Sequence, residues 1–135
     1  CDIRLAGRSA HFGQPEVSLG IMAAAGGTYR LARLVGLGKA KELLFTGDII
    51  DAEEARRIGL VNRVVDDEGV VAAARAMATR IVSLDPLAVR VTKLSVNALA
   101  RGETAQTVET LAQAILFESP GKRERMTAFL SKKKK

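Results

Sequence analysis

The stretch that most constrains this chain is a proline followed by a glutamate, with a glycine pair ten residues further on. Pro15 has a fixed φ and keeps Gln14 out of helical conformation, so the backbone direction at Glu16 is reproducible. Gly26 and Gly27 permit a tight turn, and a helical pattern begins at Thr28. We expect Glu16 at the end of a short strand, as one positioned carboxylate beside a helix start.

Hydrophobic periodicity divides the rest of the chain into a mixed part and a helical part. Alternation predicts strands within 1–6, 11–13 and 60–65, and apolar residues at helical spacing predict helices within 28–35, 39–46 and 51–59. After residue 65 we expect helices only, with new helix starts at Asp85 and Ser119. Their apolar faces are too numerous for a small core, which favours contact with another subunit.

Composition excludes several classes of protein. The chain has 135 residues, 47% of them hydrophobic, and no apolar run long enough to span a bilayer. One cysteine and one histidine cannot form an internal disulfide or a structural zinc site, so we expect no metal and a reducing compartment. We interpret Cys1 as a small buried side chain and His11 as a polar residue on a strand face.

The excess positive charge lies at one end of the chain. The net charge is +6, from 21 Lys and Arg against 15 Asp and Glu. Residues 121–135 hold seven of the basic residues and one acid, which leaves fourteen of each elsewhere. The body is therefore neutral, and we do not expect nucleic acid as the partner, although a basic helix and tail keep RNA binding open as an alternative.

Several motifs are arranged as in a known family. The run F-G-x-P-E-x-x-x-G, followed by G-G-T-x-R-L, and the later blocks within 33–65 resemble the enoyl-CoA hydratase/isomerase, or crotonase, superfamily. Members are usually about twice as long, and Cys1 matches the middle of their catalytic domain. The resemblance implies an α/β fold: the C-terminal part of a crotonase-like ββα spiral at 1–65 and a helical oligomerisation segment at 66–135.

The resemblance also implies a function and a site. Family hydratases add water across the double bond of a 2-enoyl-CoA thioester with two glutamates, and Glu16 matches the second of them. The first glutamate and both oxyanion-hole donors match sequence upstream of Cys1. Phe129 and Lys132 match residues that reach the coenzyme A of a neighbouring subunit. No separate cofactor is implied, because coenzyme A is part of the substrate.

Other functions within the resemblance stay open. Ala23–Ala25 replaces a loop in which some relatives carry a catalytic acid, which disfavours their mechanisms. A Δ3,Δ2-enoyl-CoA isomerase that uses Glu16 as its sole proton shuttle is an alternative, and so is a non-catalytic or RNA-binding relative. The expected partners are an acyl-CoA thioester and further copies of the chain, as a trimer or hexamer. The expected location is the cytoplasm, or the mitochondrial matrix of a eukaryote.

Overall fold

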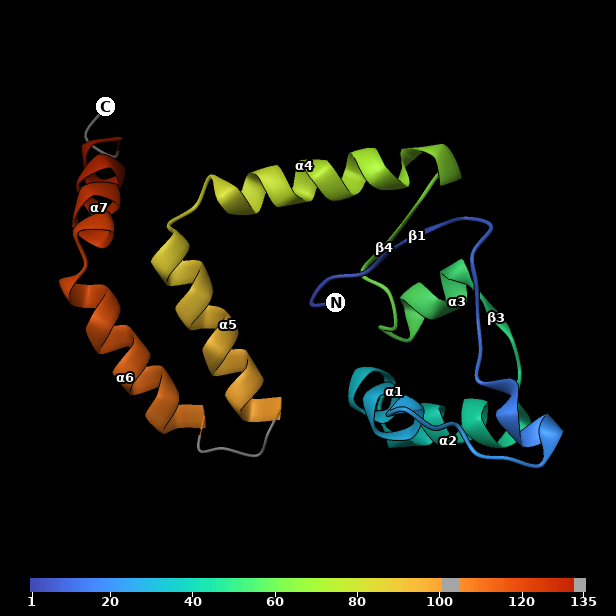
Figure 1. The fold of residues 1–135 in the computed structure, drawn as a ribbon. Coiled ribbons are helices and arrows are strands. Elements are labelled where there is room, and N and C mark those ends of the chain that lie inside the picture. The colour runs from blue at the N-terminus through green and yellow to red at the C-terminus, as the bar shows by residue number, and fades with distance from the viewer. Residues whose placement is uncertain (101–104, 133–135) are drawn as a thin grey trace. The chain divides into compact units, whose positions relative to one another are not determined.

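The computed structural model describes the backbone of residues 1–100 and 105–132, and the side chains of residues 1–98, 110–128 and 130–131. Two compact units follow each other along the chain, residues 1–76 and 77–135 (Figure 1). These units are defined by contacts within each of them. The functional division that the sequence predicts after residue 65 is not tested by them and stays a prediction.

Unit 1 alternates short strands with helices, whereas the described part of unit 2 is helical. The elements of unit 1 are β1 (Leu5–Gly7), β2 (His11–Phe12), the 3-10 helix η1 (Pro15–Leu19), α1 (Gly27–Val35), α2 (Leu37–Thr46), β3 (Ile50–Asp51), α3 (Ala52–Arg57), β4 (Arg63–Val65) and the 3-10 helix η2 (Asp67–Gly69). Helix α4 (Val70–Val82) crosses the boundary, and α5 (Pro86–Ala100), α6 (Ala105–Glu118) and α7 (Pro120–Lys132) belong to unit 2.

The strands pair in two separate ladders. β1 lies parallel to β4, with Ala6 opposite Val64. β2 lies antiparallel to β3, with Phe12 opposite Ile50. Neither ladder has a third strand among the described residues, so each is held mainly by the helices that connect and cover it.

The fourth strand begins later than the sequence predicts. We expected a strand from Leu60, but the backbone N–H groups of Leu60 and Val61 both donate to the carbonyl of Ala55, at 2.8 and 3.1 Å. Gly59 has a φ of 80°, the left-handed conformation that commonly ends a helix. The end of α3 therefore holds these two residues, and strand pairing starts only at Arg63.

The core of unit 1 consists mostly of alanines. One cluster contains Ala6, Ala52, Ala55 and Val61, and the other contains Leu31, Ala40 and Leu43. Ile50 and Leu60 pack against both clusters and join them. None of the larger described side chains is fully buried, so this core is thin.

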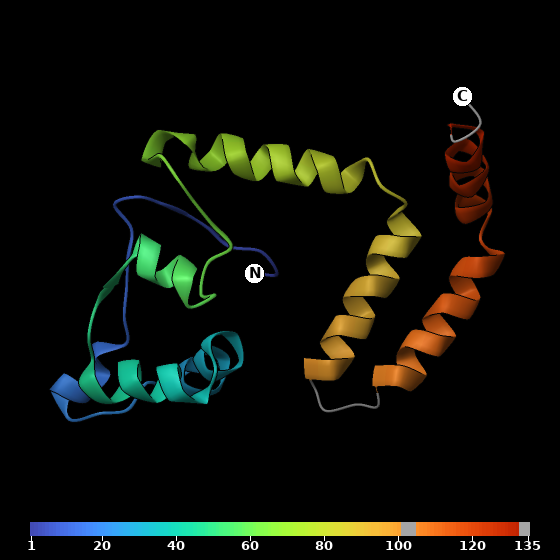
Figure 2. The ribbon, with the colours of Figure 1, turned by 180° about the vertical axis from the view of Figure 1, so that it is seen from behind.

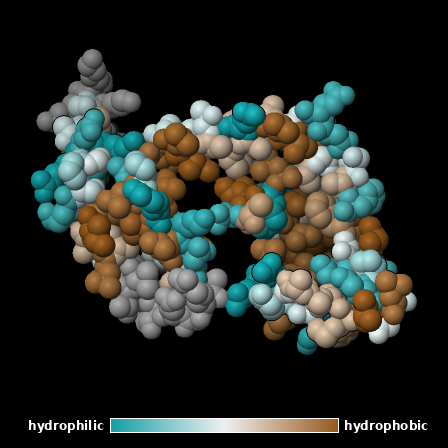
Figure 3. All heavy atoms as spheres, viewed as in Figure 1, coloured by the Kyte–Doolittle hydropathy of each residue, from teal (hydrophilic) through white to brown (hydrophobic). Residues whose placement is uncertain are grey.

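In unit 2, α5 and α6 run side by side in opposite directions (Figure 1 and Figure 2). The predicted helix starts are confirmed, since the Asp85 carboxylate accepts the Ala88 N–H at 2.9 Å and the Ser119 hydroxyl accepts the Lys122 N–H at 3.2 Å. The hydrophobic stripes are largely open to solvent, with Val82 82% exposed, and hydrophobic surface is visible over α4 and α6 in Figure 3. Within the described residues, no helix is both long and apolar enough to cross a membrane.

An ion-pair cluster joins α2 to α3. The Lys39 ammonium lies 2.6 Å from Glu42 on its own helix and 3.1 Å from Glu54 on α3. Arg57 donates two hydrogen bonds to the same Glu54 carboxylate. The hydrogen bonds from Arg57, and then from Lys39, lower the pKa of Glu54 from 4.5 to about 2. Glu54 therefore keeps its charge, and its link between the two helices, in mild acid.

This linkage predicts an acid-sensitive contribution to stability. Because folding lowers the pKa of Glu54, its contribution is fully present above pH 4.5 and is lost as the pH falls toward 2. Glu54→Gln should lower the urea midpoint at pH 7 and reduce the difference between midpoints at pH 7 and pH 3. Glu68→Gln, at an exposed carboxylate of η2, is the matched control. Equal pH dependence in wild type and Glu54→Gln would contradict the assignment.

Candidate functional site

The Glu16 side chain is carried by a short turn between β2 and the loop that leads into α1. The expectation of a strand end is wrong: Glu16 lies in η1, directly after Pro15. Proline is favoured in the first turn of a helix because it has no N–H to leave unpaired. Gly20, with a φ of 73°, ends the turn, and its N–H donates to the Val17 carbonyl at 3.1 Å.

Glycines at the ends of two helices contact this turn and the residue before it. Gly47 ends α2 beneath η1, where a Cβ would lie 3.4 Å from both Pro15 Cα and Val17 Cγ2. Gly27 begins α1 against Gln14, and a Cβ there would lie 2.7 Å from the Gln14 amide oxygen. The turn is thus supported by α2 on one side, and its preceding residue by α1. These contacts fix the backbone from which Glu16 projects.

The Glu16 carboxylate is half-buried, and one of its oxygens has an unusual environment. Oε2 is buried and has no hydrogen-bond partner among the described residues. A buried acceptor without a partner costs about 1–3 kcal/mol, and more when it is charged. Most such groups in native proteins are satisfied by protein, water or ligand. This oxygen therefore suits a site that receives a proton donor from outside the described chain.

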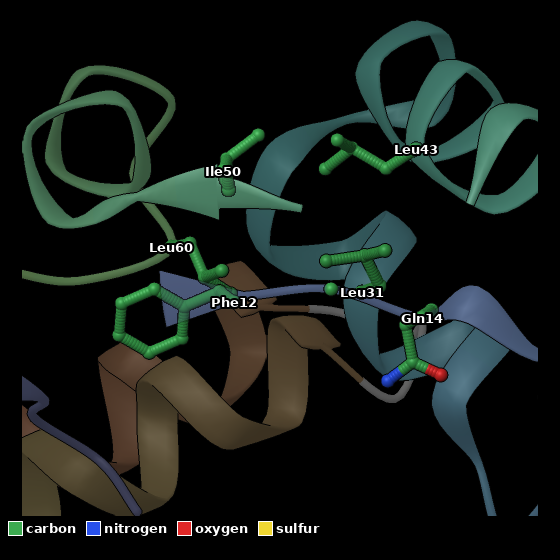
Figure 4. Close-up of a pocket in the computed structure, with 7 residues that line it drawn as sticks. Phe12, Gln14, Leu31, Leu43, Ile50 and Leu60 are labelled. Carbon is green, nitrogen blue, oxygen red and sulfur yellow. The ribbon is translucent and has the colours of Figure 1, made fainter. Parts of the chain in front are cut away.

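A small apolar cavity lies close to the turn in sequence and space. It has a volume of about 170 Å³, and Figure 4 shows its lining: Phe12 and Gln14 before η1, Leu31 from α1, Leu43 from α2, Ile50 from β3 and Leu60. The Gln14 amide is the polar group of this lining (Figure 4). Glu16 does not line the cavity, so the carboxylate and the cavity are neighbours along the chain rather than one closed site.

The loop before α1 forms the rim of a second hollow, of about 330 Å³. Ala25 has a φ of 50°, which is rare for a residue with a side chain and marks local strain. Gly26, with a φ of 91°, is the N-cap of α1, and its carbonyl accepts the Arg30 N–H at 3.0 Å. The glycine pair therefore has the helix-starting role that the sequence predicts. The guanidinium-bearing Arg30 lines the hollow together with Gln14.

The other candidate residues do not join Glu16. His11 is exposed in β2, with Nδ1 2.8 Å from the Ser9 carbonyl oxygen, as expected for a polar strand residue. The interpretation of Cys1 as buried is wrong, because its thiol is exposed and free. Phe129 and Lys132 lie in α7, but their side chains are outside the described residues, so the predicted coenzyme A contacts are not tested.

Sequence reasoning missed Gln14 as a site residue. The proline that follows predicts only an extended backbone at Gln14, yet this residue lines both hollows and its side chain packs on Gly27. The sequence signal for Gln14 is its position between a predicted strand and the Pro15–Glu16 pair.

A proline-led turn carries one half-buried glutamate, on a mixed α/β unit that is followed by helices. The family model for enoyl-CoA hydratase/isomerase matches residues 1–135. The chain belongs to this enoyl-CoA hydratase/isomerase family, as the motifs around Glu16 led us to expect.

Individual relatives support the same assignment. A crotonyl-CoA hydratase of Syntrophomonas wolfei is 48% identical over 136 residues, covering 99% of this chain and 52% of that protein. A short-chain-enoyl-CoA hydratase of Clostridium acetobutylicum is 47% identical over 139 residues, with the same coverage. The crystal structure of an enoyl-CoA hydratase from Bacillus anthracis matches with a TM-score of 0.91 at 38% identity, covering 98% of this chain and 52% of that one.

These matches confirm the expected fold class, a mixed α/β chain of crotonase type. They also show that the chain spans about half the length of these relatives.

The support beneath η1 can be tested with two glycines of one helix. Gly47 has a φ of 71°, so Gly47→Ala should destabilise the protein by about 1–2 kcal/mol through left-handed strain. Gly38→Ala, near the start of α2 with nothing within 4 Å of its Cβ, should stabilise by about 0.5–1 kcal/mol. Urea denaturation of both variants measures the difference. Equal effects of the two substitutions would show that Gly47 is not specially required.

Proposed function

We propose that the chain is part of an enoyl-CoA hydratase-type lyase, which adds water across the double bond of a 2-enoyl-CoA thioester. The observation that carries this proposal is the buried, unpartnered Oε2 of Glu16, a residue that the motif resemblance matches to a family glutamate. The names of the two relatives above, both hydratases, support it. Their identities of 47–48% extend through the whole of this chain.

Glu16 would move the proton that hydration requires. A carboxylate held in a fixed direction can accept a proton from water, or deliver one to carbon, without a new conformational search. Such positioned acid/base groups contribute about 10²- to 10⁴-fold to the rate. The turn η1 supplies the positioning, because Pro15 restrains the backbone and Gly47 lies directly beneath it.

The charge that develops on the thioester oxygen needs donors that this chain does not supply in any recognised motif. In the family these are two backbone N–H groups, each worth roughly 3–4 kcal/mol, and they match positions upstream of Cys1. The other glutamate matches a position there too. We propose that polypeptide beyond these 135 residues completes the site, in keeping with the half-length match to the relatives.

Coenzyme A contacts, assembly with further copies of the chain and the cellular location also belong to this proposed function. Phe129 and Lys132 would contact coenzyme A in a neighbouring subunit, with the lysine pairing to phosphate as a flexible point charge. The exposed apolar stripes of α5 and α6 support assembly into a trimer or hexamer. Coenzyme A would enter as part of the substrate, with no separate cofactor. The single cysteine favours a reducing compartment such as the cytoplasm or the mitochondrial matrix.

Removing the Glu16 charge tests the catalytic assignment. In the native-length protein, Glu16→Gln should lower kcat for crotonyl-CoA hydration by at least about 10²-fold while changing KM little, because it removes proton transfer rather than binding. Loss of the enoyl thioester absorbance follows the reaction. Glu68→Gln, far from η1 in sequence, should retain full activity.

The same assay separates the alternatives. Unchanged hydration in Glu16→Gln would sink the assignment of this residue. Isomerisation of a 3-enoyl-CoA without hydration of crotonyl-CoA, abolished by Glu16→Gln, would replace the lyase by an isomerase that uses Glu16 alone. Salt-sensitive RNA binding by a catalytically silent protein would favour the binding alternative.

A further inference from the structure

A hollow in unit 2 has the size and lining of a small-molecule site, and all of its lining residues belong to that unit. Its volume is about 560 Å³, within the range of about 300–1,000 Å³ that is typical of ligand pockets. The start of α5, the end of α6 and the first turns of α7 form its walls. The apolar part of the lining is Ala88, Leu116, Phe117 and Met126.

Close packing at the helix ends shapes this hollow. The Asp85 carboxylate caps α5 through the Ala88 N–H and lies against α7, where a Cβ on Gly121 would be 2.0 Å from its Oδ2. Ser119, only 8% exposed, caps α7 by accepting the Lys122 N–H. The Asp85–Gly121 contact thus brings the start of α5 against the start of α7, and each of these helix starts has its own side-chain cap. The hollow is a built concavity rather than a flat face.

Its charged groups are unevenly distributed. Lys122 and Arg125, one helical turn apart on α7, both line it, and Asp85 is the acid of the lining. The Lys122 ammonium lies 4.6 Å from the centre of the Phe117 ring, at the apolar wall. The Arg125 guanidinium reaches the Ser83 carbonyl only at 3.3–3.4 Å, which is long for a hydrogen bond. Both cations are therefore available to an incoming anion.

We propose that this hollow binds a medium-chain fatty acid as its carboxylate. The carboxylate pairs with Lys122 and Arg125, and the alkyl chain lies along Leu116, Phe117 and Met126. Arginine and lysine favour carboxylate partners, and arginine can bind one through two parallel hydrogen bonds. Asp85 leaves one net positive charge in the lining, which suits a monoanion better than a phosphate dianion. This site is independent of the proposed lyase function.

Charge complementarity also argues against an apolar protein surface as the occupant. Covering the hollow with a hydrophobic helix would remove water from two cations and give them no anionic partner, and unpaired buried charges are costly. A fatty carboxylate buries the same apolar wall and supplies the missing negative charge.

Calorimetric titration of the full chain with octanoate, decanoate and decanol, below their aggregation concentrations, tests the proposal. Decanoate should bind saturably, about tenfold tighter than octanoate, because each buried methylene contributes. It should also bind about tenfold tighter than decanol, which has the same chain without the charge. No saturable decanoate binding up to millimolar concentration, as expected if polypeptide covers the hollow, overturns the proposal.

Variants of α7 locate the site. Lys122→Gln and Arg125→Gln should each weaken decanoate binding about tenfold and leave decanol binding unchanged. Arg123→Gln is the matched control, because Arg123 is paired with Glu118 at 3.0 Å and does not line the hollow. Circular dichroism checks that each variant keeps its helices. An equal loss of decanoate binding in Arg123→Gln would mean attraction by general charge and would also overturn the proposal.

Discussion

Contacts of two helix-terminal glycines with η1 and with the residue before it are the constraint on which the candidate site depends. Gly47 and Gly27 have no side chains where α2 meets Pro15 and α1 meets Gln14. The turn that carries Glu16 therefore rests on the end of α2, and the residue before the turn rests on the start of α1. The direction of the carboxylate is thus set by residues that have no chemistry of their own. One oxygen of that carboxylate is buried without a hydrogen-bond partner among the described residues.

Features with a local cause were predictable from the sequence. The Asp51 and Asp85 carboxylates and the Ser119 hydroxyl each accept a hydrogen bond from the backbone N–H three residues later in the chain. Such a short-range cap can be predicted because it depends on the residue type at the helix start. Glycine helix ends at Gly47 and Gly59 follow from the same logic. Glu16 was identified as a positioned carboxylate because a proline precedes it. The fold class followed from family motifs rather than from periodicity.

Features with a distant cause were not predictable. β3 is two residues long, too short for any period to show, and it exists because Phe12 pairs with Ile50 across the chain. β4 loses its first residues to the end of α3, since the Ala55 carbonyl captures the N–H groups of Leu60 and Val61. The hollows lined by Gln14 depend on three or more segments meeting. A pattern along one segment contains no such information.

The neighbouring basic residues of α7 have different surroundings in the structure, although they look alike in the sequence. Lys122, Arg123 and Arg125 read as one solvated helix face, yet Arg123 pairs with Glu118 whereas the other two border an apolar hollow. A helical turn separates Lys122 from Arg125, which places them together, and Arg123 falls outside that stripe. Part of the positive charge of the C-terminal region therefore lies in contacts within unit 2, namely the Arg123–Glu118 ion pair and the lining of the hollow. Nonspecific attraction to a polyanion would not require that arrangement.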